Sequence, residues 1–156
     1  MKNLEIIIAD LSNPEHARAI VDLTNHYARD EMGLNRSLAD DILRDLISEL
    51  KTFSGYIGFI AFADGEPAGV ANCVYSFSTF YAAKVINIQD LAVKPTYRGK
   101  GIGEALMNAV EEQAKEENCK KMTLEVREDN RARSLYERFG FEYGEPKMFF
   151  MEKKVV

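Results

Sequence analysis

A short glycine-rich stretch in the second half of the chain has the residue types that bind a phosphate group. Residues 98–103 read RGKGIG. A glycine leaves its backbone N–H uncovered by a Cβ, and N–H groups at the start of a helix form a cradle for an anion. No acidic residue stands between Asp90 and Glu104, although the whole chain carries a net charge of −5. The stretch therefore predicts a phosphate-binding turn at the N-terminus of a helix.

Two other phosphate-binding signatures fit this stretch less well. A Walker A loop ends in Gly-Lys followed by Ser or Thr, and no such ending is present. The dinucleotide fingerprint requires a glycine where the chain has Glu104, although Glu125 lies at a suitable distance for the acid that binds a ribose. We expect too little chain after the turn for the second half of a dinucleotide-binding fold. A dinucleotide-dependent oxidoreductase is therefore the weaker alternative.

Size and composition predict one globular domain over residues 1–156. Hydrophobic residues make up 46% of the chain and charged residues 29%, which is ordinary for a protein with a single core. The negative net charge disfavours nucleic acid and anionic membranes as partners, and no apolar run is long enough to span a bilayer. The two cysteines and two histidines have no partners at disulfide or metal-ligand spacing. We expect a cytoplasmic protein without a bound metal.

The hydrophobic pattern predicts an α/β domain with a mixed central sheet of about six to seven strands, flanked by helices. The expected order is strand, two helices, three strands, helix, strand, helix and strand. The strands and helices are expected at residues 4–9, 14–27, 37–50, 56–63, 68–77, 84–93, 102–118, 122–126 and 130–139, with further strand-like segments in 141–156. The glycine-rich turn then joins a strand to a helix.

Two motifs in the second half of the chain resemble the GCN5-related N-acetyltransferase (GNAT) superfamily. Residues 98–103 are similar to its signature [QR]-x-x-G-x-[GA], and Leu-Ala-Val at 91–93 precedes them, as that family's fourth strand requires. Residues 130–141, NRARSLYERFGF, are similar to its second motif, in which an Asn, an Ala and a Leu-Tyr pair precede Gly-Phe. The rhythm of residues 77–93 resembles the spermidine/spermine acetyltransferase branch. The resemblance is close over residues 90–141 and weaker before residue 84.

The resemblance implies an acetyl-CoA-dependent N-acetyltransferase whose fourth and fifth strands are splayed apart. The acceptor would be a primary amine of a small molecule, polyamine-like or other, or of a peptide; the alternative is a non-catalytic acyl-CoA-binding or sensing module. The turn would hold the diphosphate of coenzyme A, and residues 91–93 would pair with its pantetheine arm. The cofactor-binding residues implied are Leu91, Ala92, Val93, Arg98, Gly99, Lys100, Gly101, Ile102, Gly103, Glu104, Asn130, Arg133 and Tyr136.

Two residues are candidates for the proton transfers. The resemblance implies that Tyr136 is the general acid that protonates the leaving thiolate, with simple packing as the alternative. In the polyamine branch the fourth strand carries a Glu-Asp pair, which reads Gln89-Asp90 here, and a glutamine cannot act as a base. Either another residue takes the role of base or the protein is not a polyamine enzyme. Glu125 is the candidate carboxylate for that role, with an exposed strand position as the alternative. The substrate-binding candidates are Tyr27, Asp30, Glu31, Gln89, Asp90 and Glu125.

An aromatic cluster closes the list of candidate surfaces. Tyr75, Phe77, Phe80 and Tyr81 lie close together in the sequence, in and after the second strand of the expected hairpin. Core packing or a homodimer contact is a more common role for such a cluster than a substrate cage.

Overall fold

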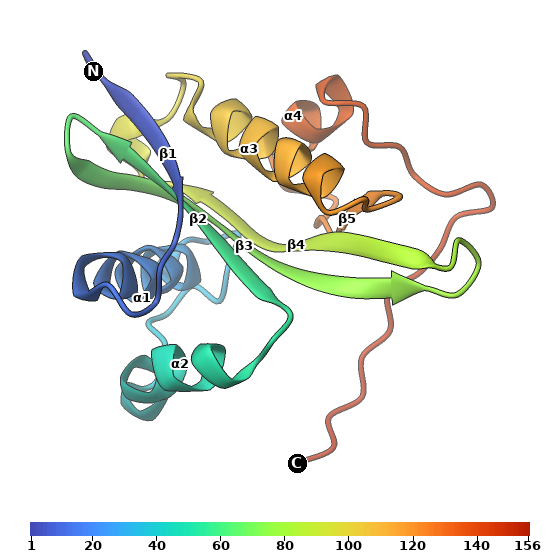
Figure 1. Cartoon of the computed structure of the whole chain (residues 1–156), viewed down its shortest axis with the longest axis horizontal. Helices are drawn as coiled ribbons and strands as arrows, with labels where there is room; N and C mark the ends of the chain where they lie inside the picture. Colours follow the sequence, from blue (N-terminus) through green and yellow to red (C-terminus); the bar gives the residue numbers. More distant parts are fainter.

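Five strands form one mixed sheet with a layer of helices on each face (Figure 1). The computed structural model describes residues 1–156. The strands lie side by side in chain order: β1 (Leu4–Ile8), β2 (Tyr56–Ala63), β3 (Glu66–Ser78), β4 (Ala83–Val93) and β5 (Met122–Leu124). The first four are antiparallel neighbours, and β5 runs parallel to β4. The mixed α/β class expected from the sequence is confirmed.

Four α-helices cover the two faces of this sheet. α1 (Pro14–Arg29) and α2 (Asp40–Thr52) lie on one face, and α3 (Ile102–Glu116) and α4 (Arg133–Arg138) lie on the other (Figure 1). α1 begins as expected, because the Asn13 side chain accepts a hydrogen bond from the Glu15 N–H at 2.9 Å. α2 begins at Asp40 and not at Ser37, whose hydroxyl instead donates to the Asn25 side chain of α1 at 3.0 Å. That bond ties the start of the α2 segment to α1.

The core has two parts, one on each side of the sheet. On the α3 side, Leu106, Met107 and Val110 are fully buried against the strands. On the α1 side, Ile20 and Leu23 are buried against β2 and β3. Each such side chain contributes about 1.5–3 kcal/mol through burial, so α1 and α3 are firmly positioned on opposite faces. None of the helices has the length and hydrophobicity that a membrane crossing requires.

β4 contains a bulge that changes which side of the sheet its side chains meet. Asn72 of β3 pairs with Asp90 and Cys73 pairs with Ile88, so Gln89 between them has no partner residue. An extra residue reverses the regular alternation of side chains along a strand. Ile88 therefore packs in the α3-side core, whereas the Asp90 carboxylate joins a hydrogen-bond network that reaches α1.

β4 and β5 separate at the same place. Their parallel pairing ends with Ile88 opposite Leu124, so residues 90–93 of β4 pair only with β3. β5 itself is shorter than the strand expected at residues 122–126. The splayed pair implied by the sequence resemblance is therefore present, and the gap opens directly in front of the glycine-rich turn.

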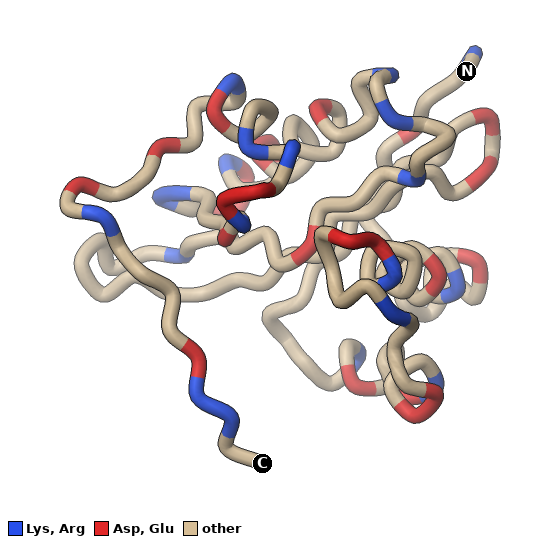
Figure 2. The backbone as a smooth tube through the Cα atoms, turned by 180° about the vertical axis from the view of Figure 1, so that it is seen from behind, with Lys and Arg blue, Asp and Glu red and all other residues tan.

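The sheet has five strands and not six to seven, because residues 142–156 form no strand. This segment makes no backbone–backbone hydrogen bonds, and its side chains are exposed. Pro146 removes one backbone donor, and residues 148–151 form an unbroken apolar run in place of the alternation that suits a half-buried strand. Figures 1 and 2 show the C-terminal end of the segment extending away from the rest of the molecule.

Candidate active site

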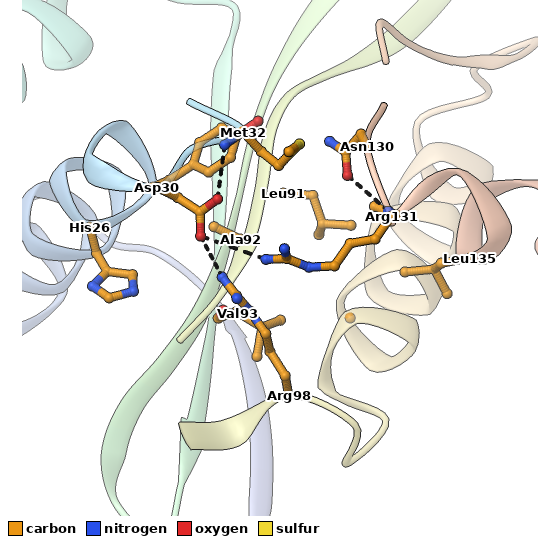
Figure 3. Close-up of a pocket in the computed structure, with 13 residues that line it drawn as sticks. His26, Asp30, Met32, Leu91, Ala92, Val93, Arg98, Asn130, Arg131 and Leu135 are labelled. Atoms are coloured by element: carbon orange, nitrogen blue, oxygen red, sulfur yellow. Dashed lines mark hydrogen bonds and ion pairs between the residues drawn. The ribbon is translucent and has the colours of Figure 1, made fainter. Parts of the chain in front are cut away.

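A cavity of about 170 Å³ lies where β4 and β5 separate. Residues 91–93 of β4 form its floor, the C-terminal end of α1 forms one wall, and residues 130–132 with Leu135 form the other (Figure 3). Gly103 of α3 closes the end that faces the glycine-rich turn. The structure thus brings the two sequence motifs, which are about thirty residues apart in the chain, to opposite sides of one groove.

The glycines of the turn have two different roles. Gly99 and Gly101 have φ values of +72° and +78°, a conformation that favours glycine, and a Cβ at either position would meet no atom within 4 Å. Their backbone N–H groups are therefore free of side-chain cover, as a phosphate cradle requires. Gly103 instead permits close packing, because a Cβ there would lie 3.2 Å from Leu135.

The other candidates around the turn differ in what they can offer a ligand. Ile102 is fully buried in the α3-side core, so only its backbone is available. Lys100 and Glu104 are exposed, and the Lys100 ammonium lies 5.5 Å from the centre of the Tyr97 ring. Lys100 is thus free to turn toward an anion bound at the turn.

The cationic end of the groove contains two arginines. Arg98 donates from Nε to the Val93 carbonyl at 3.0 Å and from Nη2 to the Asp30 carboxylate at 2.8 Å. Arg131 approaches the same carboxylate oxygen at 3.6 Å from the opposite wall (Figure 3). Its other guanidinium nitrogen lies 3.9 Å from Glu31. Two of the expected substrate-binding acids, Asp30 and Glu31, are therefore engaged by arginines.

The structure places Arg131, and not Arg133, in the groove. The Arg133 guanidinium donates to the Tyr143 hydroxyl at 2.8 Å and to the Glu128 carbonyl at 2.6 Å, outside the groove. Asn130 lies in the groove wall, where its side-chain oxygen accepts the Ala132 N–H at 2.8 Å and shapes the turn before α4. The sequence analysis assigned Arg133 to the cofactor, because both arginines belong to one motif and their spacing does not show which one faces the groove. The start of α4 at Arg133 determines this.

Tyr136 of α4 lies in the α3-side core and does not line the groove cavity. It lines a separate cavity of about 70 Å³, together with Leu124, Val126 and Phe141. It is 8% exposed and packs edge-on against Phe141 with ring centres 6.1 Å apart. Its hydroxyl makes no hydrogen bond to another protein group and still touches solvent. Burial, and to a lesser degree the nearby Tyr27, raise the pKa of Tyr136 to about 12. The phenol is therefore protonated at neutral pH, with its proton available to a ligand.

A second cavity, of about 220 Å³, lies on the other side of the bulge. It is bounded by Thr24 of α1, by α2 and by β3 and β4, and Asp90 is the only acidic residue in its lining. Asn72, which is 7% exposed, donates to Asp90 at 2.9 Å and to the Thr24 hydroxyl at 2.9 Å, and accepts from the Tyr56 hydroxyl at 2.8 Å. These hydrogen bonds fix the Asn72 side chain, and its bond to Asp90 therefore holds the Asp90 carboxylate in one orientation.

Burial sets the protonation behaviour of Asp90. Desolvation raises the pKa of this carboxyl above its ordinary value, and the hydrogen bond from Asn72 opposes part of the rise. Burial and the neighbouring Asp90 and Asp30 also raise the pKa of the Tyr27 phenol, which lies in the first cavity one helical turn from Thr24. Asp90 is thus a carboxylate with an elevated proton affinity in the lining of the second cavity, a property suited to accepting a proton from an amine.

The remaining candidates lie at the margins of this arrangement. Glu125 is exposed just beyond β5, forms no salt bridge or hydrogen bond, and lines neither cavity. Gln89 is exposed at the bulge, where its amide donates to Asn87, and it contributes to the rim of the second cavity. The buried Asn72 was missed in the sequence, although one polar residue within the apolar run of β3 was an available signal.

Comparison with known proteins gives concordant results. Residues 17–141 match the model of the Acetyltransferase (GNAT) family. A thialysine N-epsilon-acetyltransferase from Bos taurus is 32% identical over 111 residues, which are 66% of this chain and 64% of the bovine protein. The chain therefore spans less than two thirds of that relative. A protein of the same name from Caenorhabditis elegans is 27% identical over 138 residues, 88% of this chain and 82% of the relative.

Solved structures share the fold over nearly the whole chain. A probable acetyltransferase has a TM-score of 0.83 at 19% identity, with 97% of this chain and 99% of the other covered. AAC(6')-Iy in complex with the bisubstrate analogue CoA-S-monomethyl-acetylneamine has a TM-score of 0.76 at 20% identity, with 98% and 100% covered. At these identities the likeness establishes the fold.

Proposed function

We propose that this chain, which belongs to the Acetyltransferase (GNAT) family, is an acetyl-CoA-dependent N-acetyltransferase whose acceptor is a small alkyl amine bound beside Asp90. The observation that carries this proposal is the second cavity, in which one oriented carboxylate stands among mainly apolar and uncharged residues. An aliphatic chain fits such a lining, and a single ammonium group pairs with a single carboxylate. The relatives named for the N-epsilon position of thialysine support an amine at the end of a side chain.

In this proposal the two cavities hold the two substrates on opposite sides of the β4 bulge. Acetyl-CoA supplies the thioester. Residues 91–93, with the turn at 98–103 and the wall at 130–131, would bind and orient it. Asp90 would accept the proton that an ammonium must lose before it attacks, and Tyr136 would give its proton to the departing sulfur. Tyr27, which lines the first cavity, would exclude water from the reacting atoms.

The phosphate cradle can be tested at Gly101. We expect Gly101→Ala to weaken coenzyme A binding about tenfold, because its methyl group would project into the space above the turn where the diphosphate would lie. Gly65→Ala is the matched control, since Gly65 has a φ of +85° in the β2–β3 turn and a Cβ there also meets nothing within 4 Å. Both variants should lose about 1–2 kcal/mol of stability from backbone strain. Calorimetry should show weaker coenzyme A binding for Gly101→Ala alone. Equal affinities of the two variants for coenzyme A would show that the diphosphate does not bind at this turn.

The acceptor class can be tested by following coenzyme A release with a panel of amines. We expect the largest kcat/KM for diamines and lysine-like amines, and a kcat/KM at least tenfold lower for an amine at a peptide N-terminus, which is too bulky for a cavity of about 220 Å³. A preference for the peptide would contradict the proposed acceptor. Tight binding of acetyl-CoA without release of thiol to any amine would instead support the sensing module.

A further inference from the structure

The Asp30 carboxylate fills an anion site formed by two arginines. One oxygen of Asp30 lies 2.8 Å from Arg98, which comes from the segment after β4, and 3.6 Å from Arg131, which comes from the wall of residues 130–132 (Figure 3). The other oxygen accepts the N–H of Met32 at 2.9 Å. The Asp30 side chain is only 14% exposed. Asp30 thus lies in the segment after α1, and its negative charge pairs with two arginines inside the groove that faces the glycine-rich turn.

The same two arginines match the chemistry of a phosphate group. Guanidinium groups bind phosphate oxygens through paired, charge-assisted hydrogen bonds. Arg98 stands at the entrance to the turn of Gly99 and Gly101, and Arg131 stands on the facing wall. No other basic side chain lines this cavity apart from His26, whose pKa is lowered by burial and by the nearby Lys94 and Arg98, so that it is neutral. A ligand phosphate that uses these arginines must therefore compete with Asp30.

We propose that Asp30 is an internal substitute for a ligand phosphate, and that acetyl-CoA binds by displacing the Asp30 carboxylate from Arg98 and Arg131. This inference rests on the proposed position of the cofactor in the groove. Arg131 then binds phosphate. Asp30 competes with the cofactor for the arginines until the cofactor displaces its carboxylate. In Figure 2 acidic and basic residues meet at this point of the backbone, where the segment after α1 approaches the loop before α4.

Displacement has a consequence for the segment that joins α1 to α2. In the absence of ligand this segment is held to the groove through Asp30, and through the Glu31 carbonyl, which accepts a hydrogen bond from Arg127 at 3.0 Å. Loss of the Asp30 contacts would leave the contacts of Glu31 with Arg127 and Arg131. The segment also carries Ser37, whose hydroxyl bonds to Asn25 of α1. Cofactor binding should therefore loosen the connection between α1 and α2.

The decisive variant is Asp30→Asn. An asparagine keeps a side-chain oxygen for the Met32 N–H, so the local turn is preserved, but it removes the charge that competes with phosphate. We expect the Kd for coenzyme A to fall about fivefold, the size of one partly exposed ion pair, and inorganic pyrophosphate to show the same trend. The affinity should also fall more steeply with salt, because the arginines are no longer neutralised within the protein. Asp45→Asn removes an equal charge from the Arg44 pair on α2 and should change neither quantity.

The outcomes of this titration separate the inference from the function on which it rests. Tighter binding by Asp30→Asn with unchanged binding by Asp45→Asn supports the exchange. Equal or weaker binding by Asp30→Asn, in a wild type that binds coenzyme A, overturns it and leaves the proposed function intact. A wild type that binds neither coenzyme A nor pyrophosphate overturns both. An Arg131→Gln variant adds a second check, because it should weaken coenzyme A binding, whereas Arg133→Gln should not.

Discussion

Replacing Tyr136 by Phe is expected to lower kcat by about 100-fold or more, the scale of a lost general acid. The phenol is buried beside Leu124 of β5 and Phe141, and its hydroxyl has no protein partner that the substitution would leave unsatisfied. Phenylalanine preserves the edge contact with Phe141 and almost all of the buried area. The change therefore removes a proton and little else. With the pKa of Tyr136 raised to about 12, the wild-type phenol carries that proton at every pH at which the enzyme would be assayed.

The measurement is single-turnover acetyl transfer at saturating acetyl-CoA, beside calorimetric binding of coenzyme A to both proteins. Affinity should change little, because the hydroxyl matters mainly once the sulfur carries charge. Tyr75→Phe is a suitable control, since it removes a hydroxyl whose hydrogen bond is with Gln113, outside both cavities. Equal transfer rates for Tyr136→Phe and wild type would show that Tyr136 is a packing residue. Slow product release cannot hide a difference in this format.

Local features of the fold could be predicted because short-range rules determine them. The cap at Asn13, the hairpin of β2 and β3, and the start of α3 after Gly101 each follow from a few neighbouring residues. The five-strand sheet differs from the six to seven strands expected because a strand exists only where a partner is found. Residues 148–151 have the composition of a strand, but no neighbouring strand pairs with them.

The glycine-rich turn of the site could be predicted because backbone conformation determines its residues. The partners of the charged side chains could not be predicted, because they depend on the tertiary structure. The glycines of the turn were identified because their conformation admits almost no other residue. Arg131 faces the groove and Arg133 does not because α4 begins at Arg133 and leaves Arg131 in the loop before it. The role of Asp90 depends on a bulge at Gln89 that reverses the alternation of side chains within β4. The alternation of apolar and polar residues in the sequence does not reveal where such a bulge occurs. Asp30 was expected to meet the substrate, and its arginine partners come from segments far away in the sequence.

Replacing Asp90 by Asn is expected to lower kcat/KM for the amine by about 100-fold, because the variant loses both the charge that attracts an ammonium and the site that takes its proton. Asn72 can still donate to the new side chain, so the geometry of the network is retained. Glu125→Gln tests the competing carboxylate. A larger loss from Glu125→Gln than from Asp90→Asn would return the role of base to the exposed residue beyond β5.

The pH dependence of the wild type should report the same group. Burial raises the pKa of Asp90, so the carboxylate becomes protonated at a higher pH than an ordinary aspartate would. The kcat/KM of the wild type should therefore fall on the acid side of neutrality, with its acid limb above the range of exposed aspartates. The Asp90→Asn variant should lack this limb. An identical acid limb in both proteins would assign it to another residue.

Stability should change in the direction opposite to activity. The folded protein binds the Asp90 proton more tightly than the unfolded chain does, because its pKa is higher in the folded state. The free energy of unfolding of the wild type therefore decreases as the pH rises from the ordinary aspartate pKa through the raised one. Asp90→Asn has no such charge to bury. It should melt at a higher temperature than the wild type at pH 7, with the gain vanishing at a pH below the unfolded pKa of 3.8. A destabilised Asp90→Asn variant at pH 7 would mean that the buried carboxylate holds the fold together, in which case its loss of activity could not be attributed to proton transfer.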